Sequence, residues 1–324
     1  NIAKHLSDEP GITFCVFTIQ EGIELRREGI NNPILIFSRI HKDWIALAIK
    51  YKLWVNACHQ DDLIILDQFH KENGNCPEIH LKFDTGMTRL GFDPKETQKV
   101  IKYLSDHTYL PVNGIYSHFA TADEGDLSYA ESQLKKFNRI LDICKDSGKQ
   151  FGYIHCSNSG AVLNLPDSLF NTVRVGMLAY GIAPSDEVTM NIDVEPVMSF
   201  CGPIVNIRRV EAGTQISYGG VYKTKRSTNI GVIQTGFADG FPRPWYENGY
   251  ISYKGDPYNI AGRVCMDQFM VDFGNAVPEL GDEVLIFGKK DEDHIPVETI
   301  AKSIGTTTYV LLTAIQGRTD LVTI

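Results

Sequence analysis

The sequence has no long run of apolar residues, no block of basic residues and no signal-peptide pattern. Its longest apolar segments, such as WIALAI and VLLTAI, are far shorter than the roughly 20 residues that span a bilayer. The net charge is −9, which argues against nucleic acid or an anionic membrane surface as a partner. The N-terminal residues NIAKHLSDEPG do not have the pattern of a secretory leader. We therefore expect a cytoplasmic protein.

Cysteine pairs with metal-ligand spacing are also missing. The seven cysteines are odd in number and none belongs to a Cys-x-x-Cys pair, so no metal site is expected. Several lie in apolar runs such as ITFCVF and RVCMD, and we interpret most as small buried residues in a reducing compartment. The length of 324 residues suggests two domains, or one barrel with an appendage.

The first 190 residues alternate short β-rich runs with amphipathic helical segments. In residues 128–148, for example, Leu134, Phe137, Leu141 and Cys144 fall on one helical face. This alternation predicts parallel βα units. Seven strands are expected, one fewer than the eight that close a (β/α)8 barrel; an open six-stranded sheet would also fit. The predicted strands cover residues 12–17, 33–38, 53–57, 78–83, 113–119, 152–158 and 172–177.

The pattern of predicted secondary structure changes at about residue 195. Short strands separated by Gly, Pro and Asp turns follow one another, and no long helical pattern appears until VETIAKSIG near residue 297. A mainly antiparallel β domain is expected. We therefore place a barrel domain at residues 1–193 and a β domain at residues 194–324.

Polar residues follow the predicted barrel strands at their C-terminal ends, where barrel enzymes carry their functional groups. The loops after the last two predicted strands are small and polar, as barrel phosphate sites are, although each alone would also fit an ordinary turn. Arg174 lies within a predicted strand and needs an acceptor, either a carboxylate of the protein or a cofactor ring nitrogen such as that of pyridoxal phosphate. The strand-end residues are Lys82, Asp84, Arg89, His118, Asp123, Asn158, Ser159, Gly160, Arg174, Gly176 and Met177.

Eight motifs, taken in order, resemble the alanine racemases over essentially the whole chain. They are HLKFDTGMTRLGF, SHFATADE, HCSNSGA, VRVGMLAYG, ISYGGVY, GFADGFPR, RVCMDQFMVD and GTTTYV. The resemblance implies a fold-type III pyridoxal 5′-phosphate enzyme with a (β/α)8 TIM-type barrel and a C-terminal β domain. It also implies a head-to-tail homodimer that racemises L- and D-alanine by two-base Cα proton transfer and supplies D-alanine for cell-wall peptidoglycan.

The resemblance further assigns roles to individual residues, with no metal among them. Tyr218 is the base that one subunit supplies to the other, and Lys82 is a lysine that is often carbamylated and then holds Arg89. The catalytic set is Tyr218, His118 and Arg174; the cofactor set is His118, Asn158, Ser159, Arg174, Gly176, Met177 and Tyr309; the substrate set is Arg89, Met266 and Asp267; the entrance set is Asp123, Arg243 and Arg263.

The sequence departs from the family pattern in three places. The family's Schiff-base lysine lies in a Lys-x-x-x-Tyr-Gly motif upstream of residue 1, so about 35–45 further N-terminal residues are expected. Phe237 stands where tyrosine is common and Thr307 where an aliphatic residue is usual. A serine or broad-specificity racemase, or a non-catalytic pyridoxal phosphate-binding relative, therefore remains an alternative, although Tyr218 and Met266 in a full β domain favour catalysis.

Overall fold

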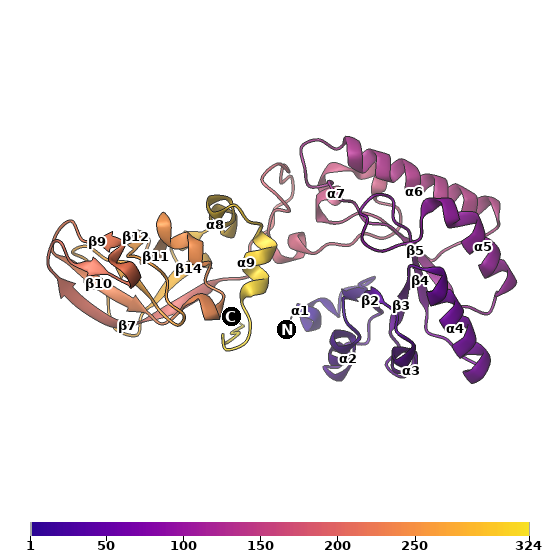
Figure 1. The fold of residues 1–324 in the computed structure, drawn as a ribbon, viewed down its shortest axis with the longest axis horizontal. Helices are drawn as coiled ribbons and strands as arrows, with labels where there is room; N and C mark the ends of the chain where they lie inside the picture. Colours follow the sequence, from indigo (N-terminus) through magenta and orange to yellow (C-terminus); the bar gives the residue numbers. More distant parts are fainter. Residues whose placement is uncertain (1, 324) are drawn as a thin grey trace. The chain divides into compact units, whose positions relative to one another are not determined.

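The chain divides into two compact units, Asn1–Val175 and Gly176–Ile324, in a computed structural model that describes residues 2–323 (Figure 1). Within that range no helix is both long enough and apolar enough to cross a membrane. All seven cysteines are free thiols, and Cys15 is exposed, whereas Cys58, Cys144 and Cys156 are buried. No group of three His, Cys, Asp or Glu side chains among the described residues is arranged to hold a metal ion.

A parallel sheet of six strands, paired in sequence order, forms the first unit. This curled α/β sheet confirms the barrel-type fold class, and its helices lie along its outer side (Figure 1). The strands are β1 (Phe14–Val16), β2 (Ile34–Arg39), β3 (Trp54–Ala57), β4 (Ile79–Lys82), β5 (Val112–Tyr116) and β6 (Tyr153–His155). The helices are α1 (Ile2–Leu6), α2 (Ile19–Arg27), α3 (Ile45–Lys50), α4 (Gln60–Asn73), α5 (Thr97–Asp106), α6 (Ser128–Asp146) and α7 (Ser159–Asn164).

The seventh predicted strand, residues 172–177, is not formed. Only an isolated parallel bridge joins Thr172 to His155 in that segment. Val173 and Val175 are exposed, so the burial of β-branched side chains that stabilises a strand is missing there. The prediction of a strand over this segment was therefore wrong.

Local signals explain where the helices begin and which face they bury. Thr18 and Glu21 form a capping box at the start of α2, and Gly74, with φ 75°, ends α4 in the left-handed conformation. The predicted apolar face of α6 is buried through Phe137 and Cys144. These faces pack on the sheet and form the core of the unit.

The strand register sets two layers of side chains across β4, β5 and β6. Parallel pairing aligns β4 with β5 and β5 with β6 over consecutive residues. Because successive side chains of a strand point to opposite faces, residues two apart share a face. One layer holds His80, Gly114 and Tyr153, and the next layer, toward the C-terminal strand ends, holds Lys82, Tyr116 and His155.

The second unit is built on an antiparallel sheet of seven strands, as the sequence predicted for this part of the chain. The order across the sheet is β11-β12-β13-β10-β7-β14-β15, and β8 and β9 form a separate pair. The strands are β7 (Phe200–Val210), β8 (Gln215–Ile216), β9 (Tyr222–Lys223), β10 (Thr228–Ile233), β11 (Tyr250–Tyr253), β12 (Asp256–Ile260), β13 (Phe269–Asp272), β14 (Glu283–Lys290) and β15 (Asp293–Ile295). Two helices, α8 (Val297–Ile304) and α9 (Thr308–Ala314), follow the strands.

Candidate active site

Arg174 contacts several polar groups in the strand-end region of the first unit. Its Nη1 donates to Nδ1 of His155 at 2.7 Å. Its Nη2 donates to the carbonyl oxygens of Ser117 and Cys156, at 2.7 and 3.0 Å, and lies 3.1 Å from Nδ1 of His118. None of these acceptors is a carboxylate, so the contacts are those of a cation held by neutral groups. They do not support the ion-pair interpretation.

His118 follows β5, and its burial beside Arg174 keeps the ring neutral. An arginine side chain has only donors, so Nδ1 of His118 accepts and its proton is on Nε2. Burial, together with the charges of Arg174 and Arg89, lowers the pKa of His118 to about 3. The ring is therefore uncharged at neutral pH and offers an N–H donor on its other side.

Lys82 ends β4 and is buried, with a side chain only 6% exposed. Its Nζ lies 5.6 Å from the centre of the Tyr116 ring. Burial, followed by the positive charges of Arg89 and Arg174, lowers the pKa of Lys82 to about 8. With that pKa, about one lysine in ten is neutral at pH 7, whereas an ordinary lysine is almost fully protonated.

Asp84 shapes the loop that carries Arg89. Its carboxylate accepts the backbone N–H groups of Gly86, Thr88 and Arg89 at 2.8, 3.0 and 3.1 Å. Gly86 has a φ of 149° and Thr88 a φ of 57°, conformations that such a tight loop requires. Arg89 is exposed at the loop surface. Its predicted pairing with a carbamylated Lys82 stays a prediction.

Two further loops meet beside the start of α7. Asn158 caps this helix, since its Oδ1 accepts the backbone N–H of the residue three positions later at 3.0 Å. Ser159 is buried. A Cβ on Gly160 would lie 2.8 Å from the Cβ of Asp123, so glycine permits the loop after β5 to approach α7. The structure thus brings together Asp123 and the Asn158–Ser159 pair.

Tyr218 stands at a strained turn of the second unit. It is 65% exposed, and Ser217, Gly219 and Gly220 beside it have φ values of 63°, 73° and 56°. The Ser217 hydroxyl donates to the carbonyl oxygen of Arg263 at 2.5 Å, which anchors the turn to the loop before β13. Left-handed residues cluster at functional sites, and here they present the phenol outward.

The loop carrying Met266 is braced by the GFADGF segment. The N–H of Phe237 donates to the Cys265 carbonyl at 3.1 Å, and that of Ala238 to the Met266 carbonyl at 3.0 Å. A Cβ on Gly236 would lie 2.1 Å from the Met266 carbonyl oxygen. Gly236 has a φ of −141°, so space rather than backbone conformation requires glycine. Met266 itself is exposed beside Phe237.

Charged residues surround these two loops. Arg318 donates to Asp239 at 2.7 Å and to Asp267 at 2.6 Å, so Asp267 is engaged in an ion pair. The guanidinium carbon of Arg243 lies 5.5 Å from the centre of the Phe237 ring. Of the predicted entrance residues, Arg243 and Arg263 thus contact the Phe237 and Tyr218 loops of their own unit.

The predicted phosphate-binding residues are divided between the units. Gly176 precedes the 3-10 turn Met177–Tyr180, and Met177 is buried in the core of the second unit. Tyr309 lies in the first turn of α9, two residues after Thr307 at the N-cap. Ser159 belongs to the first unit. Their joint role in phosphate binding stays a prediction.

Sequence reasoning missed two residues that contact His118 or Arg174 and hold them in place. Gln133 of α6 is fully buried, and it accepts the N–H of Ala120 at 2.9 Å and donates to the His118 carbonyl at 3.1 Å. His155 contacts Arg174 from the end of β6. The one sequence signal for His155 was its place in the predicted strand at residues 152–158.

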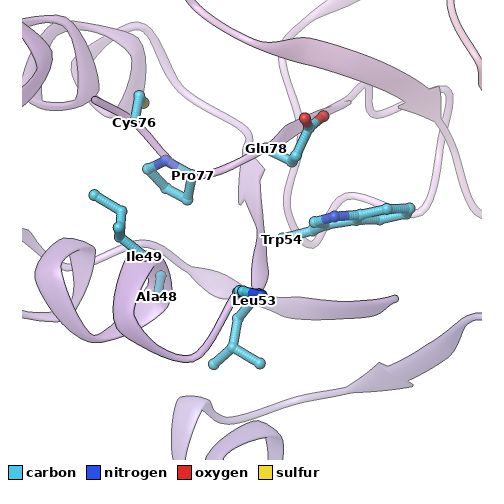
Figure 2. A pocket seen from close by; sticks show the side chains of 8 residues that line it. Ala48, Ile49, Leu53, Trp54, Cys76, Pro77 and Glu78 are labelled. Carbon is cyan, nitrogen blue, oxygen red and sulfur yellow. The ribbon is translucent and has the colours of Figure 1, made fainter. Parts of the chain in front are cut away.

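A cavity of about 210 Å³ lies at the other ends of the strands, away from these loops. Figure 2 shows the side chains of Ile49, Leu53, Trp54 and Pro77 around it. Leu53 and Trp54 are at the N-terminal end of β3, and the cavity is therefore separate from the strand-end site.

Comparison with known proteins identifies relatives over nearly the whole chain. The family model described as alanine racemase, N-terminal domain, matches residues 1–184, and the one described as alanine racemase, C-terminal domain, matches residues 197–323. An alanine racemase of Desulforamulus reducens is 37% identical over 314 residues, which are 96% of this chain and 84% of that protein. The solved alanine racemase of Clostridium difficile 630 has a TM-score of 0.90 at 34% identity, covering 97% of this chain and 82% of the other. A Bacillus anthracis alanine racemase with bound L-Ala-P has a TM-score of 0.84 at 32% identity, over 93% and 78%.

Proposed function

Since the chain belongs to the alanine racemase family, we propose that it interconverts L- and D-alanine with pyridoxal 5′-phosphate as its cofactor, and so supplies D-alanine for peptidoglycan. The observation that carries the proposal is the donor set of Arg174. Its hydrogen bonds to His155, Ser117, His118 and Cys156 use only the two terminal nitrogens, so within residues 2–323 the Nε–H is among the donors left over. Such a donor fits an unprotonated pyridine nitrogen.

Bound pyridoxal phosphate would supply a ring that withdraws electrons from the Cα of an amino acid. Arg174 would donate to the ring nitrogen and disfavour its protonation, which limits side reactions. His118, neutral with its proton on Nε2, would lie beside the ring, and Asn158 next to it. Ser159, Gly176, Met177 and Tyr309 would bind the phosphate.

Tyr218 would hold and release the Cα proton on one face of the substrate. A phenol ionises only near pH 10 in water, so a tyrosine base needs positive charge nearby. In the proposed head-to-tail homodimer, Arg174 of the partner subunit provides that charge, with His118 between them. The outward position of Tyr218 on its turn suits a residue that acts across a subunit interface.

Arg89 and the backbone N–H of Met266 would bind the substrate carboxylate. Lys82 would assist as a carbamate, formed when its neutral amine bonds to the carbon of CO2 and releases a proton. The pKa of about 8 makes that neutral amine about 300-fold more abundant at pH 7 than in an ordinary lysine. The carbamate is an anion, so it would lower the summed charge of Lys82, Arg89 and Arg174 from +3 to +1.

A subunit-mixing experiment tests the proposal. Tyr218→Phe and Arg174→Ala should each lose most alanine racemisation. Co-expressed, they should recover about one quarter of the wild-type activity, because half of the dimers are mixed and one of their two sites has both residues. No recovery would exclude shared sites, and an Arg174→Ala enzyme as active as wild type would exclude the role of Arg174. L-serine, tested beside L-alanine, distinguishes a broad-specificity racemase.

A further inference from the structure

Two buried histidines connect Arg174 with the interior of the barrel. Nδ1 of His155 accepts from Arg174 at 2.7 Å, and Nε2 of His155 lies 3.1 Å from Nδ1 of His80. Both histidines are almost fully buried. The Tyr116 ring stacks on His155 at 4.7 Å and lies 5.4 Å from the Arg174 guanidinium carbon. It therefore packs beside the contact between His155 and Arg174.

In the line of hydrogen bonds from Arg174 through His155 to His80, every donor points away from Arg174. Arg174 can only donate, so Nδ1 of His155 must accept and its proton is on Nε2. That Nε2–H donates to Nδ1 of His80, whose own proton is then on Nε2. Burial lowers the pKa of His80 to about 4, and burial with the charge of Arg174 lowers the pKa of His155 well below its usual value. Both rings are therefore neutral and carry the same tautomer.

The far end of the line has no acceptor. Nε2 of His80 is buried and has no hydrogen-bond partner within residues 2–323. The ring instead stacks on Trp54 at 5.1 Å and lies 5.5 Å from the Tyr153 ring. A buried donor without a partner destabilises a fold. The polar function of His80 is thus directed at His155 alone.

Gly114 makes the contact between the two histidines possible. The strand register places Gly114 of β5 between His80 of β4 and Tyr153 of β6. A Cβ on Gly114 would lie 2.3–2.5 Å from three atoms of the His80 ring. The backbone of Gly114 does not have a positive φ, so its conformation does not require glycine. The missing Cβ instead leaves room for the His80 ring to cross β5 and reach His155 in the next layer.

We propose that His80 is a positioning residue, which through His155 holds the Arg174 guanidinium in the orientation needed to contact the cofactor ring. Without His80, the Nε2–H of His155 loses its acceptor, and the other tautomer would direct an N–H against Nη1 of Arg174. Two facing donors would turn the guanidinium away. The inference rests on the proposed role of Arg174. The line of hydrogen bonds itself is observed in the structure and does not depend on that role.

Nitrogen NMR of the protein with 15N-labelled histidine rings tests the line directly. We expect His80 and His155 to be neutral, with the proton on Nε2, between pH 6 and 8. A proton on Nδ1 of either ring, or a charged ring, would overturn the proposal. His80→Asn keeps an acceptor near the position of Nδ1 and should preserve the His155 tautomer, whereas His80→Phe should abolish it.

Kinetics then test the positioning role. His80→Phe should lower kcat by about tenfold with KM within about twofold, as expected for the loss of one buried hydrogen bond, and His80→Asn should recover most of the loss. The matched control is His70→Phe, because the buried Nδ1 of His70 also has no partner among the described residues, and this ring stacks on Tyr109 away from Arg174. That variant should keep the wild-type kcat.

Gly114→Ala tests the positioning role independently, because the added Cβ would displace the His80 ring. It should reproduce the kcat loss of His80→Phe, and it should cause no additional loss in a His80→Ala background, where the clashing ring is gone. If the His155 tautomer changes in His80→Phe but kcat does not, the positioning role is wrong while the proposed function stands. Wild-type activity in Arg174→Ala would instead contradict the proposed function.

Discussion

Replacing Lys82 with methionine tests whether a buried amine destabilises the first unit at neutral pH. Methionine keeps an unbranched side chain, one atom shorter than that of lysine, and removes the charge. Lys82 is 6% exposed, and its pKa is lowered from 10.5 to about 8, chiefly by burial. That difference corresponds to about 3 kcal/mol of unfavourable free energy when the amine is protonated.

The sign of the pH dependence follows from the direction of the pKa change. Between pH 8 and 10.5 the unfolded chain binds more protons than the folded chain at this lysine, so stability increases as the pH rises. The unfavourable free energy is fully present below about pH 8 and disappears above about pH 10.5. Lys82→Met should therefore raise the free energy of unfolding by about 3 kcal/mol at pH 7, and the advantage should fade toward pH 10.5.

The measurement is urea-induced unfolding in CO2-free buffer at a series of pH values, followed by tryptophan fluorescence. The control is Lys71→Met, since Lys71 is exposed and its Nζ lies 2.8 Å from Asp67, so this variant should show no gain. Equal pH dependence of wild type and Lys82→Met from pH 7 to 10.5 would refute the reasoning. Added bicarbonate should reduce the advantage of methionine if Lys82 forms a carbamate, which 13C NMR detects directly.

Three other predictions concern single groups. Tyr218→Phe should slow exchange of the Cα hydrogen from one alanine enantiomer far more than from the other, and equal losses would contradict a base that serves one face. The His118 ring signals should not titrate between pH 5 and 8, because its pKa is lowered to about 3, and a midpoint near 6.5 would show that the ring is not buried against Arg174. Gly236→Ala should destabilise the second unit by about 1–3 kcal/mol in calorimetry, because its Cβ would lie 2.1 Å from the Met266 carbonyl oxygen, and an unchanged unfolding temperature would contradict that contact.

A position at the end of a strand predicted which residues of the first unit belong to the candidate site. It did not predict which of their atoms contact one another. Lys82 ends β4, and His118 and Ser159 follow β5 and β6, where parallel strands direct their C-terminal ends to one edge. The strand expected at residues 172–177 is not formed, since Val173 and Val175 are exposed there. An apolar pattern indicates which residues can be buried, but whether a neighbouring strand covers them depends on distant parts of the chain.

The sequence by itself determined the two structural classes, the order of their elements and the family resemblance. Period-two and helical patterns are local, so they can be read along the chain without knowing which segments meet. Only the tertiary structure decided that Arg174, His155 and His80 form one line of hydrogen bonds past Gly114, because that contact depends on the register of β4, β5 and β6. The lowered pKa of Lys82 likewise required the fold, since burial and the approach of two arginines from separate loops arise only when the strands are assembled.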